Sequence, residues 1–179
     1  MRNYYSEADM LCAEVQQVLH DGTLALQTRS VHYGKLTRHG MCIVVPPALI
    51  RRSRQHFYSF GPSVGVHMIL GMNGMIWLQP LTAATVLRDD GNEDAEMQDA
   101  DEDIAAVKKR REMEAAADAA IPLEIRTNMC RIANCIRALA GQLLPISVQA
   151  IETVLEDSVH LSPGSMLSPE VQRQITRRV

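Results

Sequence analysis

The stretch that decides the fold is GVHMILGMNGMIWL (65–78), in which two apolar runs meet at Asn73-Gly74. The first run alternates as a half-buried β-strand does, and the second ends at Pro80. Asn-Gly between two such runs is the strongest local signal for a β-hairpin, since a type I′ turn needs positive φ at both central residues. We therefore predict two strands joined at Asn73 and Gly74.

The same stretch contains Gly71-Met72-Asn73-Gly74, a G-x-x-G sequence that could form a loop gripping a nucleic-acid backbone. A gripping G-x-x-G joins two helices and turns its backbone N–H groups toward phosphate. Here the sequence joins two predicted strands instead. We interpret Gly71, Asn73 and Gly74 as a structural turn.

A second hairpin is predicted upstream. LCAEVQQVL (11–19) and TLALQTR (23–29) both alternate, and HDGT (20–23) between them contains an Asp-Gly turn. A lone hairpin is marginal in water, so this one is expected to belong to a larger sheet. The polar segment 30–40 is predicted to be a connector, followed by the short apolar strand MCIVVP (41–46).

The remaining elements are predicted to be helices, which makes the fold class α+β. PALIRRSRQHFYSF (47–60) has a helical pattern with Pro47 at its start, and GPS (61–63) ends it. Three C-terminal helices are expected at 122–144, 147–159 and 168–179, the last opened by Ser168 and Pro169. The first of the three has apolar residues spaced three or four apart: Ile125, Met129, Ile132, Ile136, Leu139 and Leu143.

Charge is distributed unevenly along the 179 residues, whose formal net charge is −3. Residues 89–103 contain nine acids and no base, and the rest of the chain has 12 acids against 18 bases. A mildly basic body favours polyanions such as nucleic acid. The segment 85–120 is predicted to be disordered or a floating helix. Its KKRR (108–111) could be a nuclear import signal or an RNA contact, and a solvated charge run explains it equally well.

Several classes of protein are disfavoured. The sequence has no apolar run long enough to span a membrane. Its four cysteines form no C-x-x-C and no histidine pair has zinc spacing, so we predict no metal site and reduced, buried thiols. No catalytic triad, Walker loop or dinucleotide loop is present, so we predict no enzyme and no cofactor.

Three segments together resemble a known family. They are LQTRSVHYGKLTRHGMCIVVPPALIRRSRQHF (26–57), VGVHMILGMNGMIWLQP (64–80) and RIANCIRAL (131–139). They are similar to the RNA-exosome cap subunit of the ribosomal-RNA-processing protein 4 family, over roughly residues 10–80 and 122–145. The SVHYGKL segment favours this subunit over its sister cap protein.

The resemblance implies the following domain organisation. Residues 1–38 would be the last part of an S1-type OB-fold barrel with its connector, and residues 39–84 and 121–146 a KH domain. An acidic, Ala-rich insertion would occupy 85–120, and a C-terminal helical extension 147–179. Trp77 is expected to pack the KH domain against the barrel, with stacking on a base as the minority alternative.

Family members are non-catalytic and lie on a ring of RNase PH-like subunits, where they help to form the entry of RNA into a central channel. The resemblance therefore implies RNA, ring subunits and other cap proteins as partners, without a membrane. It also implies a role in 3′-end trimming and ribosomal RNA maturation, in the nucleus and nucleolus and also in the cytoplasm.

The chain differs from the family pattern at three places. The earlier barrel strands are missing, the acidic segment lengthens the link to the last KH helix, and IRRSRQH (50–56) lacks glycine where a KH domain has its G-x-x-G loop. Without glycine, the close approach of the backbone to phosphate is lost. The candidates for RNA contact are therefore basic side chains, namely Lys35, Arg38, Arg51, Arg52 and Arg54.

Two other functions fit the same residues. The chain could be a stand-alone KH protein that binds RNA outside any ring, in which case the isolated chain would bind single strands with a steep salt dependence. It could also be a purely structural assembly subunit that never touches RNA.

Overall fold

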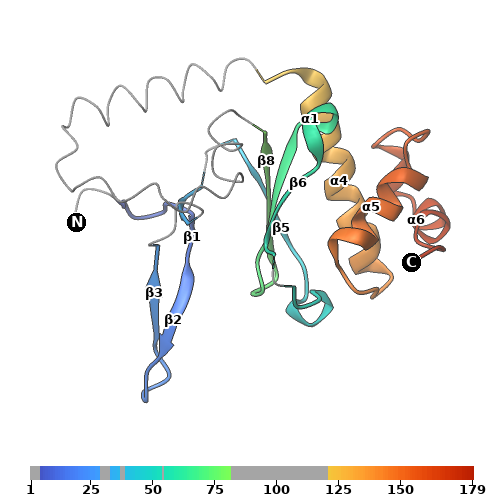
Figure 1. Ribbon diagram of the computed structural model, residues 1–179. Helices are drawn as coiled ribbons and strands as arrows, with labels where there is room; N and C mark the ends of the chain where they lie inside the picture. Colours follow the sequence, from blue (N-terminus) through green and yellow to red (C-terminus); the bar gives the residue numbers. More distant parts are fainter. Residues whose placement is uncertain (1–4, 29–32, 37–38, 54, 82–120) are drawn as a thin grey trace.

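The computed structural model describes residues 5–28, 33–36, 39–53, 55–81 and 121–179. Its fold class is α+β (Figure 1): a central sheet has helices packed on one side and two thin β-ribbons from the N-terminal part on the other. The predicted acidic insertion at 85–120 lies outside the described residues. No helix in the described ranges is long and apolar enough to cross a membrane.

The central sheet is antiparallel with the strand order β5-β8-β7-β6. Its strands are β5 (Met41–Val44), β6 (Phe57–Ser59), β7 (Val66–Leu70) and β8 (Met75–Pro80). The predicted strand at 41–46 and the predicted hairpin of 65–78 are both confirmed, because β7 and β8 pair in register from Val66 with Pro80 to Leu70 with Ile76. Val64, just before this hairpin, is the last residue of a short helix.

The type of the β7–β8 turn differs from the prediction. The Gly74 N–H donates to Gly71 O at 3.2 Å, so the central residues are Met72 and Asn73 rather than Asn73 and Gly74. Only Gly74 has positive φ, at 90°, and Asn73 does not. The turn is therefore an ordinary turn followed by a glycine bulge, and the type I′ prediction is wrong because the loop is longer than two residues.

The predicted helix at 47–60 is also wrong. Its first residues form a 3₁₀ turn, η1 (Pro47–Leu49), after which the chain extends into β6. Tertiary contacts override the local pattern: Ile50 is buried and forms a parallel β-bridge with Ile146, and the Arg51 N–H donates to Ile146 O at 3.0 Å. The segment GPS, predicted to break a helix, instead begins the one-turn helix α1 (Gly61–Val64).

All three C-terminal helices are confirmed, as α4 (Leu123–Gly141), α5 (Val148–Asp157) and the shorter α6 (Pro169–Ile175), with the 3₁₀ turn η2 (Ser165–Leu167) before α6. Leu143 was wrongly placed on the apolar face of α4. The helix ends before it, and Leu143 has φ 56° and is 74% exposed. Leu143 N–H donates to Ala140 O and Leu144 N–H to Leu139 O, which is a Schellman ending with leucine at the usual glycine position.

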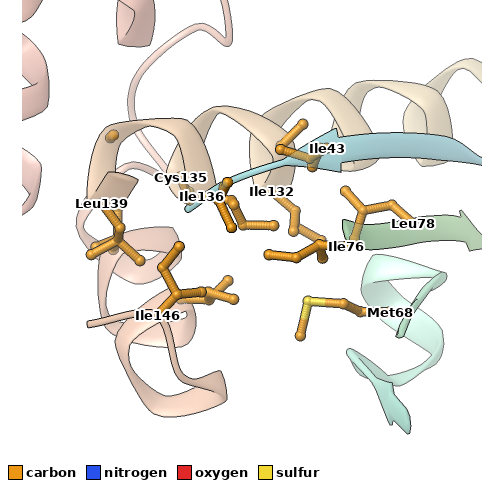
Figure 2. Packing of buried hydrophobic residues seen from close by; sticks show 14 of the residues in the cluster. Ile43, Met68, Ile76, Leu78, Ile132, Cys135, Ile136, Leu139 and Ile146 are labelled. Carbon is orange, nitrogen blue, oxygen red and sulfur yellow. The ribbon is translucent and has the colours of Figure 1, made fainter. Parts of the chain in front are cut away.

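The core lies between the sheet and α4 (Figure 2). Ile132, Ile136 and Leu139 of α4 project toward the sheet residues Met68, Ile76 and Leu78. All six side chains are fully buried, and each contributes about 1.5–3 kcal/mol by leaving water. The same cluster includes residues of α5, η2 and α6, namely Ile151, Val154, Met166 and Ile175. The C-terminal helices therefore share one core with the sheet.

The segment RIANC of α4 fixes the chain after α5. The Arg131 guanidinium donates to the carbonyls of Ser158 and Leu161, and Asn134 Nδ2 donates to Pro163 O at 2.8 Å. These donors satisfy the carbonyl at the end of α5 and two carbonyls of the loop that follows it. Of the four cysteines, all free, only Cys135 in this segment is buried, so the prediction of buried thiols holds for that one alone.

Two ribbons form the N-terminal part. β2 (Glu14–Val18) pairs with β3 (Leu24–Gln27), which confirms the hairpin, and β1 (Leu11–Cys12) pairs with β4 (Gly34–Lys35). The segment 30–40 was predicted to be only a connector, but its residues 34–35 return to β1. Each ribbon has two strands among the described residues, so the barrel assignment stays a prediction.

A β-bulge organises the β2–β3 ribbon. The register shifts between Val15 and Gln17, so Val15 faces Leu26 and Val18 faces Leu24. Residues 15 and 18 would lie on opposite faces of a regular strand, and the bulge brings them to the same face. The ribbon therefore has one apolar face, and all four of these side chains are exposed.

Candidate nucleic-acid interface

The basic loop, residues 51–53 and 55, lies between η1 and β6, and its start is beside the residues that lead into α5. Its first residue is held by the backbone bond to Ile146, and after it the His56 carbonyl accepts from the Leu70 N–H at 2.8 Å. The side chains of Arg51 and Arg52 are exposed and form no ion pair with any residue the structure describes. Two positive charges are thus presented to solvent on a loop whose two ends are fixed. Arg54 lies outside the described residues.

The β7–β8 turn lies at the same end of the sheet as the basic loop. Gly74 O accepts from the Val45 N–H at 2.9 Å, and a Cβ on Gly74 would come within 2.3 Å of Val45 O. The turn is therefore packed tightly against the chain that leads into η1. Beyond it lie three exposed apolar side chains, Val44, Met72 and Met75, of which Val44 and Met75 are cross-strand neighbours.

Most of the turn's backbone donors are already used. The N–H of Gly71 donates to Met75 O, that of Gly74 to Gly71 O, and that of Met75 to the side-chain oxygen of Asn73. A phosphate cradle needs such donors to be unoccupied and convergent. The G-x-x-G sequence joins strands and bonds to itself, which is the geometry of a structural turn.

Lys35 lies elsewhere. It belongs to β4, and its Nζ is 2.6 Å from an Asp9 carboxylate oxygen. This ion pair offsets much of the charge that Lys35 would offer to phosphate. Among the described residues no ion pair joins Lys35 to the basic loop, which borders the central sheet rather than the β1–β4 ribbon. Arg38 lies outside the described residues.

Trp77 lies on the face of the sheet opposite the helices. It is 7% exposed, its Nε1 donates to Gln79 Oε1 at 3.1 Å, and a Cβ on Gly40 would come within 2.1 Å of the indole ring. Two strands away, Phe57 pairs with Ile69, the cross-strand neighbour of Trp77, and its ring meets that of Tyr33 edge to face with centroids 5.5 Å apart. Residues of the predicted connector thus cover this face. Trp77 is too buried to stack on a base.

Sequence reasoning missed the partners of two groups. It did not pair Lys35 with Asp9, 26 positions earlier in the chain, or Tyr58 with Glu152, 94 positions apart. No local signal could have found the second pair, because the two side chains meet only when β6 packs near α5. In the described part of the chain, no three His, Cys, Asp or Glu residues are arranged to hold a metal.

Comparisons with known proteins bear on the fold that carries these residues. A family model described as a KH domain matches residues 40–84, which span β5 to β8 and a few residues beyond. The "Exosome complex component RRP4 homolog" of Arabidopsis thaliana is 37% identical over 173 residues, covering 95% of this chain and 50% of the relative. The homologue of Caenorhabditis elegans is 35% identical over 158 residues, covering 88% of this chain and 44% of the relative.

The "Exosome complex component RRP4" of Saccharomyces cerevisiae is 32% identical over 189 residues, covering 98% of this chain and 52% of the relative. The chain thus spans about half the length of the curated relatives it matches. The similarity includes both the sheet and the C-terminal helices. Along nearly all of its residues, the chain is therefore similar to the RRP4 family of exosome complex components.

Proposed function

We propose that the chain is a non-catalytic, RNA-binding cap subunit of the RNA exosome. The observation that carries this proposal is the similarity to proteins named exosome complex components over 88–98% of the chain. The cap would guide RNA into the channel of a ring of RNase PH-like subunits for trimming from the 3′ end, including ribosomal RNA maturation. The chain would act in the nucleus and nucleolus and also in the cytoplasm.

The basic loop is the proposed point of RNA contact. Arg51 and Arg52 are exposed, unpaired among described residues, and held by backbone bonds at both ends of the loop. Guanidinium groups bind phosphate oxygens in pairs, and binding single strands through phosphates is independent of sequence. The loop would therefore steer RNA by charge and show little sequence preference.

Membership of the complex can be tested in the organism's own cells. The tagged chain is purified by affinity and its partners are identified by mass spectrometry. We expect ring subunits in near-equal amounts. Recovery of none, with tight binding of single-stranded RNA by the isolated chain, would support a stand-alone KH protein instead.

The RNA contact needs a separate test in the assembled complex. Arg51→Glu/Arg52→Glu is compared with Arg173→Glu/Arg177→Glu, which reverses the same charge at exposed positions near the C-terminus. We expect only the first pair to weaken RNA binding. Losing two phosphate contacts should reduce the salt slope by roughly 1.4, since each contact to a single strand contributes about 0.7. An unchanged slope would remove the basic loop from the RNA path.

A second candidate, a subunit that only holds the assembly together, is favoured by the Lys35–Asp9 ion pair. One of the predicted RNA contacts is thereby occupied within the chain. If the charge reversal in the basic loop lowers recovery of ring subunits and leaves RNA binding by intact complexes unchanged, this second function replaces the first.

A further inference from the structure

A pocket lies between β6, α1 and α5, apart from the basic loop. Its volume is about 360 Å³, and it is lined by Tyr58, Phe60, Val64, Glu152, Leu155 and Glu156. One wall is thus aromatic and aliphatic, and the helix opposite contributes two carboxylates.

The aromatic wall is fixed in place. The rings of Tyr58 and Phe60 meet edge to face, with centroids 5.1 Å apart. The Tyr58 hydroxyl donates a short hydrogen bond to Glu152, and this bond, together with burial, raises the pKa of Tyr58 to about 12. The phenol therefore stays protonated as a donor, and Glu152 is held against the ring.

The two carboxylates are not paired with any basic residue that the structure describes. Glu152 and Glu156 are one helical turn apart, where like charges repel, and neither forms an ion pair with a described residue. Glu156 also lies in the last turn of α5, where the helix dipole disfavours an acid and no basic residue is present. By contrast, the neighbouring Asp157 is compensated by Arg178 at 2.7 Å. No basic residue in the described part of the chain offsets these acids, so the pocket is suited to a cation supplied by another molecule.

We infer that this pocket binds an arginine side chain presented by a partner protein. The aliphatic stem would pack on Val64 and Leu155, and the guanidinium would lie against the Phe60 ring and between the two carboxylates. Arginine suits this site because its planar group stacks on aromatic rings and forms paired hydrogen bonds with carboxylates. The same negative charge repels RNA phosphate, so the pocket is a protein contact independent of the proposed RNA-binding loop.

The pocket can be tested on the 179-residue chain by NMR. The probe is the blocked tripeptide acetyl-Gly-Arg-Gly-amide, and the matched probe carries citrulline, which has the shape of arginine without its charge. We expect the arginine probe to shift the backbone amides of residues 59–61 and 155 saturably at concentrations up to the order of 10 mM, a range suited to a single side chain. The citrulline probe should shift them far less.

Variants of the chain separate the pocket from general charge. Glu152→Gln/Glu156→Gln keeps an acceptor for Tyr58 and should weaken binding of the arginine probe about tenfold or more. Glu124→Gln/Glu170→Gln removes the same charge at exposed positions on α4 and α6 and should leave binding unchanged. Phe60→Leu should weaken binding while retaining the carboxylates.

Three results would each overturn the inference: no saturable shift in the wild-type chain, equal binding of the citrulline probe, or equal weakening in both pairs of variants. Thermal unfolding of each variant checks that it is folded before the titration. None of these results bears on exosome membership or on the basic loop, so the two proposals can fail separately.

Discussion

The two hairpins of this protein have the same turn in opposite surroundings. In both, a glycine N–H donates to the carbonyl three residues earlier, at 3.0 Å for Gly22 and 3.2 Å for Gly74. The two glycines have φ of 84° and 90°. In both, the preceding side chain, Asp21 or Asn73, accepts from the N–H two residues later, at 3.0 and 3.1 Å.

The flanking strands differ completely in burial. Every residue of β7 and all but the first of β8 are buried, whereas β2 is wholly exposed and β3 alternates between exposed and half-buried. The β7–β8 hairpin has β5 and β6 beside it, α4 on one face and connector residues on the other. The comparison shows that the geometry of a turn is set by residues within the turn. The burial of its flanking strands depends instead on whether distant segments pack against them.

The largest expected effect contrasts one side chain from each hairpin. Ile76→Ala should lower the free energy of unfolding by about 3 kcal/mol, because it leaves a cavity in the core shown in Figure 2. Leu26→Ala, at a position 61% exposed, should change it by less than about 0.5 kcal/mol. Urea unfolding followed by circular dichroism measures both. A large loss for Leu26→Ala would mean that the first hairpin is covered in solution.

A glycine pair sharpens the contrast at the turns. Both Gly22→Ala and Gly74→Ala force a side chain into positive φ, which costs about 1–2 kcal/mol each. A Cβ on Gly22 would meet nothing within 4 Å, whereas one on Gly74 would lie 2.3 Å from Val45 O. Gly74→Ala should therefore be more destabilising by about 2 kcal/mol, the penalty for overpacking. Equal losses of unfolding free energy, measured with urea, would show that both turns accommodate an added Cβ equally well.

The packing of connector residues on the sheet face opposite the helices can be tested at Gly40. Gly40→Ala would place a methyl group within 2.1 Å of Trp77 and should cost about 2 kcal/mol. Gly164→Ala is the matched control, since Gly164 has ordinary helical φ and no atom within 4 Å of its added Cβ. Adding Trp77→Leu to the Gly40→Ala chain should restore part of the lost free energy of unfolding. If the losses from the two substitutions simply add, the indole is not what the added methyl group meets.

The smallest expected effect is a pH dependence that only the first turn shows. Hydrogen bonds from Thr23 hold the pKa of Asp21 below its ordinary value of 3.8. These bonds are therefore complete above the ordinary value and are lost as the pH falls through the lowered one. In an NMR titration, the chemical shift of the Thr23 amide should change with a midpoint below pH 3.8. The shift of the Met75 amide, which donates to the uncharged side chain of Asn73, should stay constant. Asp21→Asn should abolish the shift, and a midpoint at or above 3.8 would contradict the prediction.

Part of the fold could be predicted because its signals are local. The Asp-Gly and Asn-Gly pairs located both hairpins, and apolar spacing of three and four located α4. The error at 47–60 has the opposite origin. Its residues have a helical pattern, yet Ile50 is drawn into a bridge with Ile146 and residues 57–59 complete the edge of the sheet. A contact partner nearly 100 positions away leaves no trace in a short sequence window.

The candidate site divides in the same way. Sequence alone identified Arg51 and Arg52 as candidates for RNA contact, and their exposure follows from residue type. It could not tell that Lys35 is paired with Asp9, or that the turn at Gly74 is packed against Val45. It also gave no hint of the pocket between β6 and α5, whose walls are about 90 positions apart.

By itself, the sequence determined where the chain turns, where its long helix begins and which side chains are charged, because each of these depends on residues within a few positions. The tertiary structure alone decided which hairpin is buried, which strand replaces a predicted helix and where two carboxylates meet an aromatic wall. These depend on burial and pairing between distant segments, whose energy is released only when the segments come together.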